Sequence, residues 1–182
     1  MGGWREPTSR LPLRWGTYRG RYLAGLLLIT GGILHLQSST THLLLPLLVG
    51  TTAHVIGWWI LPGRGVPRLM VVLPCCVAQW LLLTGPQSTW VLAVPFLAWL
   101  WVRGRPPLSV PTVLIVVLTG VAVAQGLHEY SSMWIAISIT GASLVVAAWA
   151  ARWIAVRVPV RLRRTRRDRR HDRANPQRRT ID

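Results

Sequence analysis

Long apolar runs bordered by arginine constrain the fold of this chain more than any other feature of its sequence. Apolar residues make up 51% of the 182 residues, and they form continuous stretches instead of the alternating or amphipathic patterns of a water-soluble core. A helix needs about 20 mainly apolar residues to cross a bilayer, with about 17 as the lower limit. Six stretches reach or approach this length: 22–37, 42–61, 68–84, 87–102, 110–127 and 131–153.

The connections between these stretches predict the architecture. They are short, and short connections join antiparallel neighbours. The sequence therefore predicts an all-α fold, a polytopic integral membrane protein folded as an up-and-down bundle of six transmembrane helices. The fourth stretch is short and carries Pro95 near its middle, which makes it the weakest of the six predicted spans.

Arginine alternates with the apolar stretches and predicts the topology. The segments 1–21, 62–68, 103–109 and 157–182 carry arginine, whereas the connections 38–41, 85–86 and 128–130 carry none. Because basic residues in short loops favour the cytoplasmic side, we predict a multi-pass protein with both termini in the cytoplasm. If the fourth stretch did not cross the membrane, the basic C-terminus would lie outside the cytoplasm, so six spans are favoured over five. All 21 basic residues are arginine, which indicates a GC-rich genome and hence a bacterial inner membrane.

The same charges divide the chain into three parts. Residues 1–20 are a basic cytoplasmic segment, residues 21–156 the transmembrane domain, and residues 157–182 an arginine-rich tail that we expect to be disordered, or helical only against a partner. Anionic lipid headgroups attract such a tail with about 1 kcal/mol per basic residue. The predicted headgroup ligands are Arg157, Arg161, Arg163, Arg164, Arg166 and Arg167. Nucleic acid is disfavoured, because no aromatic side chain interleaves the arginines, while an acidic protein partner stays open.

Several other residue types fit a membrane bundle. Cys75 and Cys76 are adjacent, which strains a disulfide, so we interpret them as small buried hydrophobes. Tryptophan prefers the headgroup level, and the predicted belt residues are Trp58, Trp59, Trp99, Trp101, Trp149 and Trp153 at the inner face and Trp80, Trp90 and Trp134 at the outer face. Small residues four apart predict close helix packing, within one chain or between copies, at Gly120 and Ala124 and at Ser143, Ala147 and Ala151.

Polar groups inside or beside the membrane stretches are the candidate functional residues. His54 lies near the middle of the second stretch, where an unpaired imidazole is expensive. The remaining candidates lie toward the outer ends: His35, His42, His128, Glu129, Gln79 and Gln125. A bundle could gather them into an outward-facing site for a solute or a proton. In the alternative interpretation, the end residues are ordinary interfacial polarity and a neutral His54 bonds to a helix carbonyl or a threonine.

Catalytic and cofactor patterns are missing from the sequence. It has no Gly-x-Ser-Gly, no paired intramembrane aspartates, no His-Glu-x-x-His, no phosphate-binding glycine loop and no Cys-x-x-Cys. We therefore expect no enzyme, no cofactor and no metal site. The sequence favours a non-enzymatic accessory or scaffold component of a membrane assembly, in contact with anionic lipids and with a membrane-protein partner or further copies of itself. The alternative is a small-solute or proton-linked transporter, or its membrane subunit, using a site near His54.

Overall fold

The computed structural model describes residues 16–40, 42–63 and 65–174, and for residues 65, 67 and 158–174 it gives the backbone alone. The described part contains no strand, which confirms the all-α prediction. Its six α-helices are α1 (Tyr18–Leu36), α2 (Leu45–Ile60), α3 (Gly65–Leu81), α4 (Ala93–Val102), α5 (Val113–Gly126) and α6 (Met133–Ala174). The 3₁₀ segments η2 (Leu82–Thr84), η3 (Pro86–Leu92), η4 (Pro107–Thr112) and η5 (Tyr130–Ser132) extend α3, α4, α5 and α6.

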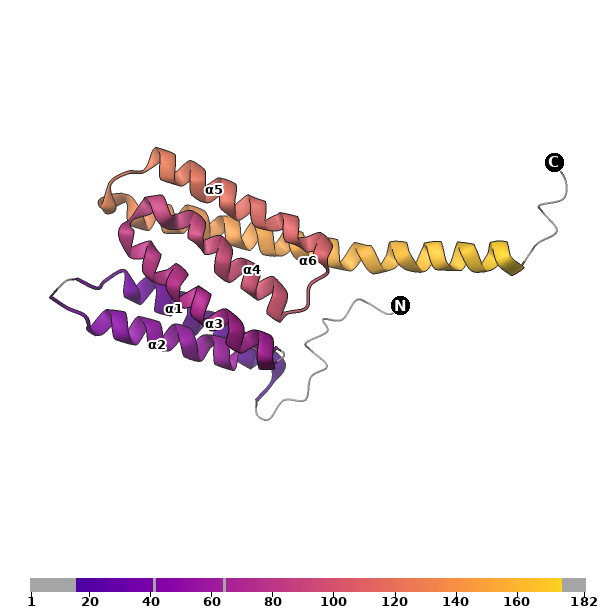
Figure 1. Cartoon of the computed structure of the whole chain (residues 1–182), viewed down its shortest axis with the longest axis horizontal. Coiled ribbons are helices and arrows are strands. Elements are labelled where there is room, and N and C mark those ends of the chain that lie inside the picture. Colours follow the sequence, from indigo (N-terminus) through magenta and orange to yellow (C-terminus); the bar gives the residue numbers. More distant parts are fainter. Residues whose placement is uncertain (1–15, 41, 64, 175–182) are drawn as a thin grey trace.

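Successive helices run in opposite directions (Figure 1). One end of the bundle therefore carries the starts of α1, α3 and α5 and the ends of α2 and α4, and α6 continues past it. We call it the basic end, since the described arginines there include Arg19, Arg21, Arg68, Arg103, Arg105 and Arg152. Two helical stretches, Pro107–Gly126 and Tyr130–Arg157, are long and apolar enough to cross a membrane, while Leu45–Ile60 and Arg68–Thr84 are apolar but shorter. The six-span topology stays a prediction.

The fourth segment is helical throughout, although it changes geometry along its length. The 3₁₀ segment η3 leads directly into α4, which begins at Ala93. Pro95 is thus the third residue of α4 instead of the middle of a long α-helix. In the first turn of an α-helix the missing N–H and the fixed backbone angle of proline are tolerated, which explains how this stretch stays helical.

Glycine pairs bring the backbones of α1 and α2 into close contact. A Cβ on Gly32 would lie 2.6 Å from the carbonyl oxygen of Gly50, and one on Gly57 would lie 2.8 Å from that of Gly25. Gly25 and Gly32 are seven residues apart on α1, and Gly50 and Gly57 are seven apart on α2, so the two glycines of each helix face the other helix. By contrast, a Cβ on Gly31 would meet nothing within 4 Å. Only the backbone surfaces of glycine permit this approach.

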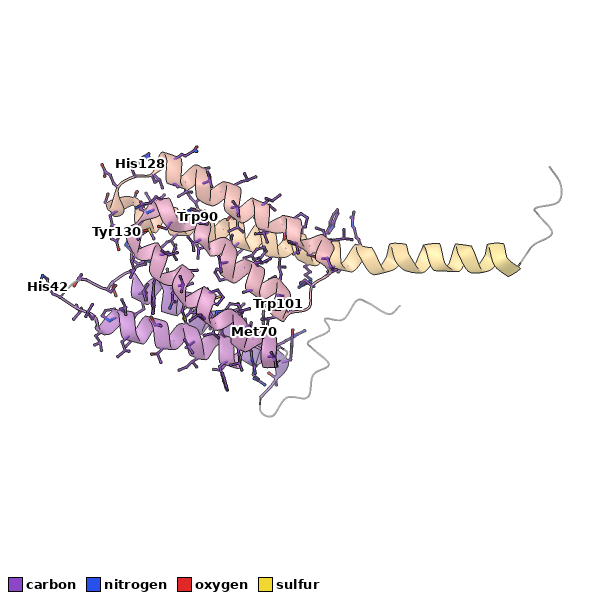
Figure 2. The ribbon with its side chains drawn as sticks, viewed as in Figure 1. His42, Met70, Trp90, Trp101, His128 and Tyr130 are labelled. Carbon is purple, nitrogen blue, oxygen red and sulfur yellow. The ribbon has the colours of Figure 1, made fainter. Side chains whose placement is uncertain are left out.

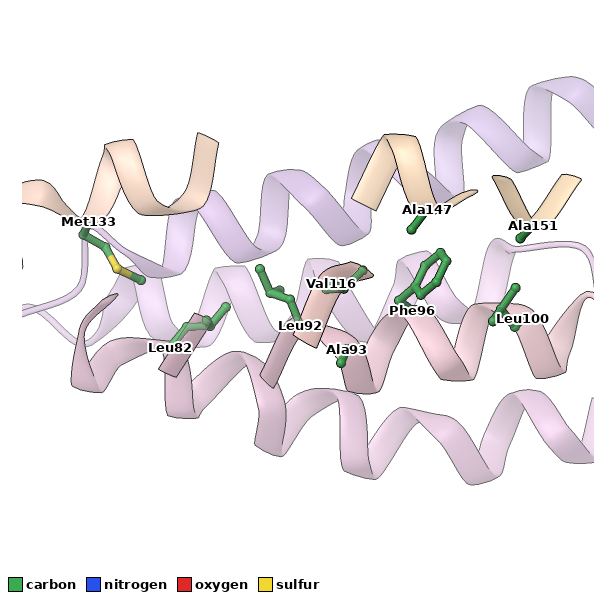
Figure 3. Close-up of a cluster of buried hydrophobic side chains, with 9 residues drawn as sticks. All are labelled: Leu82, Leu92, Ala93, Phe96, Leu100, Val116, Met133, Ala147 and Ala151. Atoms are coloured by element: carbon green, nitrogen blue, oxygen red, sulfur yellow. The ribbon is translucent and has the colours of Figure 1, made fainter. Parts of the chain in front are cut away.

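The α4–α5–α6 half uses small residues in a similar way. Ala147 and Ala151 are buried against Phe96 and Leu100 of α4 (Figure 3). Ser109 donates a hydrogen bond to the carbonyl of Ala151 at 3.3 Å, and Gly120 lies against the backbone of Trp90. Packing at Gly120, Ala147 and Ala151 is therefore confirmed, within one chain.

The C-terminal segment differs from its prediction. The backbone of α6 stays helical through Ala174, whereas the sequence predicted disorder, or a helix only against a partner, from residue 157. Arginine is a good helix former, and continuing an existing helix avoids the cost of nucleating a new one. Residues 175–182 lie outside the described part.

Candidate functional site

At the basic end, arginines bind groups on neighbouring helices. Arg21 Nε of α1 donates to the carbonyl of Ile60 at 3.2 Å, and a guanidinium nitrogen of Arg68 donates to the carbonyl of Leu61 at 3.0 Å. Both carbonyls belong to the last turn of α2, where the helix leaves its carbonyls without partners and where cations are favoured by the helix dipole. These bonds tie α1 and α3 to the end of α2.

Further arginines of the basic end line a cleft of about 480 Å³ between α1, α4 and α6. One wall is a single face of α6, formed by Val145, Ala148, Trp149, Arg152 and Val156. Residues at these three- and four-residue spacings lie on one side of a helix. The opposite wall consists of Tyr22, Trp99, Arg103 and Arg105. The cleft thus combines three guanidinium groups with aromatic and aliphatic surface.

Arg103 is fixed in the wall of this cleft. It is buried, one of its terminal nitrogens donates to the Tyr18 hydroxyl at 2.8 Å, and its guanidinium lies 4.3 Å from the ring centre of Tyr22. The Trp99 ring contacts two cations, with the guanidinium of Arg103 5.1 Å and that of Arg105 5.5 Å from the ring centre. Burial first, and then the charges of Arg105 and Arg152, lower the pKa of Arg103 to about 9. The side chain is still cationic at neutral pH.

His54 is fully buried in the middle of α2. Trp58 Nε1, one turn along the helix, donates to His54 Nε2 at 3.1 Å. Because indole can only donate, Nε2 is the acceptor and a neutral ring carries its proton on Nδ1. Nδ1 has no hydrogen bond of good geometry, although the backbone of Ile29 on α1 lies near enough to interact. Trp58 is thus a partner that the sequence interpretation did not include, in addition to the predicted helix backbone. It is buried and not a belt residue.

Gln79 is the second candidate inside the bundle. It is 1% exposed, and neither its side-chain oxygen nor its nitrogen has a hydrogen-bond partner among the described residues. Its neighbour Trp80 lies on the outer surface, where Nε1 donates to Thr51 of α2 at 3.0 Å. The structure therefore encloses one unsatisfied amide on α3 and one imidazole on α2.

The remaining predicted site residues are not gathered around His54. His35, His42, Gln125, His128 and Glu129 are all exposed. His42 lies on the α1–α2 connection and His128 beyond the end of α5, apart from each other (Figure 2). Glu129 accepts a hydrogen bond from Ser131 next to it at 3.1 Å. Within the described chain, no three His, Cys, Asp or Glu residues lie close enough to hold a metal ion.

The prediction for the two cysteines is confirmed, whereas the lipid contacts predicted for the tail stay a prediction. Cys75 and Cys76 are buried free thiols, as predicted. Arg157 stacks 3.4 Å from the ring centre of Trp153, at the place where α6 leaves the bundle. The side chains of the other predicted headgroup ligands lie outside the described part: Arg161, Arg163, Arg164, Arg166 and Arg167.

Comparison with protein families, curated proteins and solved structures found no match to this chain. The arginine cleft was absent from the sequence-based candidates, which treated Arg103 and Arg105 as topology markers only and assigned no role to Arg152. A usable signal was present, since Trp99 and Arg103 share one face of α4 and Trp149 and Arg152 share one face of α6. The sequence alone does not show that this face of α4 lies opposite this face of α6.

Proposed function

We propose that this chain is a multi-pass protein of a bacterial inner membrane, with six membrane-crossing helices and both termini in the cytoplasm. We further propose that it serves as a non-enzymatic accessory or scaffold component of a membrane assembly. The observation that carries the membrane assignment is the surface: in each of the two longest apolar spans only 28% of the residues are buried. A core helix of a water-soluble protein buries most of its apolar residues.

Segment lengths and charge placement support the six-span arrangement. At 1.5 Å per residue, the 16 residues of α2 cover about 24 Å, somewhat less than the hydrocarbon thickness of about 30 Å. Local thinning of the bilayer and flanking side chains that reach the interface accommodate such a mismatch. Arg21 and Arg68 at the end of α2 are side chains of this kind. The arginines gather at one end of the bundle, which is the asymmetry expected of a cytoplasmic face.

The scaffold assignment is supported by where the polar groups lie. A transport site needs polar groups that a solute can reach. Here the two deep candidates, His54 and Gln79, are 0% and 1% exposed, while the histidines at the opposite end lie exposed on the surface. Large apolar side chains on every helix remain available to partner helices.

Molar mass of the assembly tests the scaffold proposal. The chain purified from its own membrane in mild detergent is expected to elute as a complex of fixed stoichiometry, heavier than the 20.3 kDa single chain. Light scattering that corrects for bound detergent measures this mass. A stable particle containing one chain and no partner would contradict the proposal.

Transport is retained as a second candidate because of one observation. Buried polar groups without hydrogen bonds are rare and often have a function, and the side-chain amide of Gln79 is such a group. Its helix α3 packs against α2, which carries the buried His54. Proton flux into proteoliposomes, followed with a pH-sensitive dye, is expected to be lost in His54→Ala and kept in His35→Ala, a matched change at an exposed histidine. Equal flux in both variants, or no flux in the wild type, would remove this candidate.

A further inference from the structure

We propose that the cleft lined by Arg103, Arg105 and Arg152 is a binding site for a phosphate-bearing anion. The inference rests on the proposed function only for the placement of the cleft at the membrane surface. It differs from the expected lipid contacts of the tail, because it names one built site between α1, α4 and α6 with room for a single ligand.

The donor set fits phosphate chemistry. Guanidinium groups offer planar pairs of N–H donors that match the oxygens of phosphate, often two at a time. Two of the three arginines come from the end of α4 and the connection after it, and the third comes from α6, so they approach the cleft from opposite walls.

The site is organised before a ligand arrives. The Tyr18 hydroxyl and the rings of Tyr22 and Trp99 hold the Arg103 guanidinium. Fixed donors lose less conformational entropy on binding than free ones. Arg152 is exposed and can close on the ligand from the other side.

The ligand has two possible sources with the same chemistry, the headgroup of an anionic phospholipid and free phosphate. Val145, Trp149 and Val156 form an apolar wall beside the cations, and basic pockets between membrane helices on the cytoplasmic side recognise lipid headgroups. Aliphatic and indole surface next to guanidinium groups matches a molecule that carries both a phosphate and acyl chains.

Native mass spectrometry of the full chain in detergent tests the site, with phosphatidylglycerol, phosphatidylcholine and inorganic phosphate as probes. We expect one retained phosphatidylglycerol, little retained phosphatidylcholine, and binding at least about tenfold weaker in Arg152→Gln. Arg19→Gln removes the same charge from an exposed position at the same end of the bundle, and its binding should change less than about twofold. Arg105→Gln is a second cleft variant, and thermal unfolding verifies that each variant is folded.

The outcomes separate the alternatives. Displacement of the lipid by inorganic phosphate, sensitive to Arg152→Gln, would support the site and assign it to free phosphate. Equal weakening in Arg19→Gln and Arg152→Gln, or equal retention of both lipids, would overturn the proposal. If the membrane assignment itself were wrong, the chain would stay soluble without detergent. This result can be told apart from a loss of anion binding. Flotation with vesicles is expected to be unchanged in Arg152→Gln, since the apolar helices remain.

Discussion

The outer surface of this bundle carries large apolar side chains just as its interior does, whereas a water-soluble protein keeps most of them inside. The interior holds leucine, valine, Phe96 and Trp58, together with glycine, alanine, serine and threonine and the polar His54 and Gln79. The outer surface holds leucine, valine, isoleucine and tryptophan on every helix, and Leu118 of α5 and Trp149 of α6 are 66% and 71% exposed. The comparison teaches that polarity does not sort the side chains between interior and surface.

This lack of sorting is expected when the solvent is itself apolar. Lipid chains are as apolar as leucine, so burying leucine gains little, and helices associate through close packing and interhelical hydrogen bonds instead. The glycine pairs between α1 and α2 and the bond from Ser109 to the carbonyl of Ala151 are contacts of this kind. Four substitutions or conditions test the contrast, from the largest expected effect to the smallest.

A charge on the outer surface should have the largest effect. Leu118→Arg places a cation in the middle of α5, which costs about 3 kcal/mol at the centre of a bilayer and almost nothing at the surface of a soluble protein. The fraction of chain that integrates into membranes measures the effect. Leu108→Arg, at an equally exposed position in η4 at the basic end, should be tolerated. Equal tolerance of both changes would contradict a lipid-facing surface.

The next effect concerns the glycine contact. Gly32→Ala would force a methyl group to within 2.6 Å of the Gly50 carbonyl oxygen, and overpacking of this kind costs about 1–3 kcal/mol. Gly31→Ala adds the same methyl group one residue earlier, where nothing lies within 4 Å, and should be neutral or slightly stabilising. Unfolding in denaturing detergent measures both free energies. A similar loss in the two variants would show that α1 and α2 do not pack through Gly32.

Removing the buried amide should have a smaller effect of opposite sign. Gln79→Met keeps the length of the side chain and eliminates two buried polar atoms that have no partner in the described structure. We expect unfolding to become harder by about 1 kcal/mol. Thr89→Val is the contrasting change, because the Thr89 hydroxyl donates at 2.9 Å to the carbonyl of Pro86, and it should destabilise. Destabilisation by Gln79→Met would indicate a polar partner and favour the transport candidate.

The smallest effect is a pH dependence of anion binding in the cleft. The groups that face Arg103 are Tyr18 and Tyr22 from α1, Arg105 from the connection and Arg152 from α6. Because burial and these cations lower the pKa of Arg103 to about 9, its charge is complete at neutral pH and is lost as the pH rises through that value. Phosphatidylglycerol affinity should therefore fall by a few-fold between neutral pH and about pH 10.

The Arg103→Gln variant is the control for this pH dependence. It should bind more weakly at neutral pH and show a smaller fall over the same interval. The lowered pKa of Arg103 also makes the free energy of unfolding depend on pH, in the direction opposite to its effect on binding. The unfolded chain holds the Arg103 proton to higher pH than the folded chain does, so this group makes folding more favourable as the pH rises above about 9. Affinity that stays constant up to about pH 10 would remove Arg103 from the site.

The sequence predicted the parts of the structure that depend on local composition. Apolar runs and the positions of arginine located all six helical segments. A helix in lipid has to be apolar and to satisfy its own backbone hydrogen bonds, so the sequence of each segment is enough to identify it. The sequence did not predict the contact of Gly32 with Gly50, the bond from Trp58 to His54 or the cleft around Arg103. Each of these depends on how one helix is rotated toward another. The helical course of residues 157–174 was also missed, since it depends on continuity with α6.

Accessibility of single cysteines in intact bacterial cells tests the membrane topology most directly. Ser38→Cys lies on the α1–α2 connection and Leu108→Cys lies at the basic end, both at exposed positions, in a background where Cys75 and Cys76 are replaced by alanine. A maleimide that cannot cross the membrane is expected to label Ser38→Cys in intact cells and Leu108→Cys only after permeabilisation. Labelling of Leu108→Cys in intact cells, or equal labelling of both, would contradict the account.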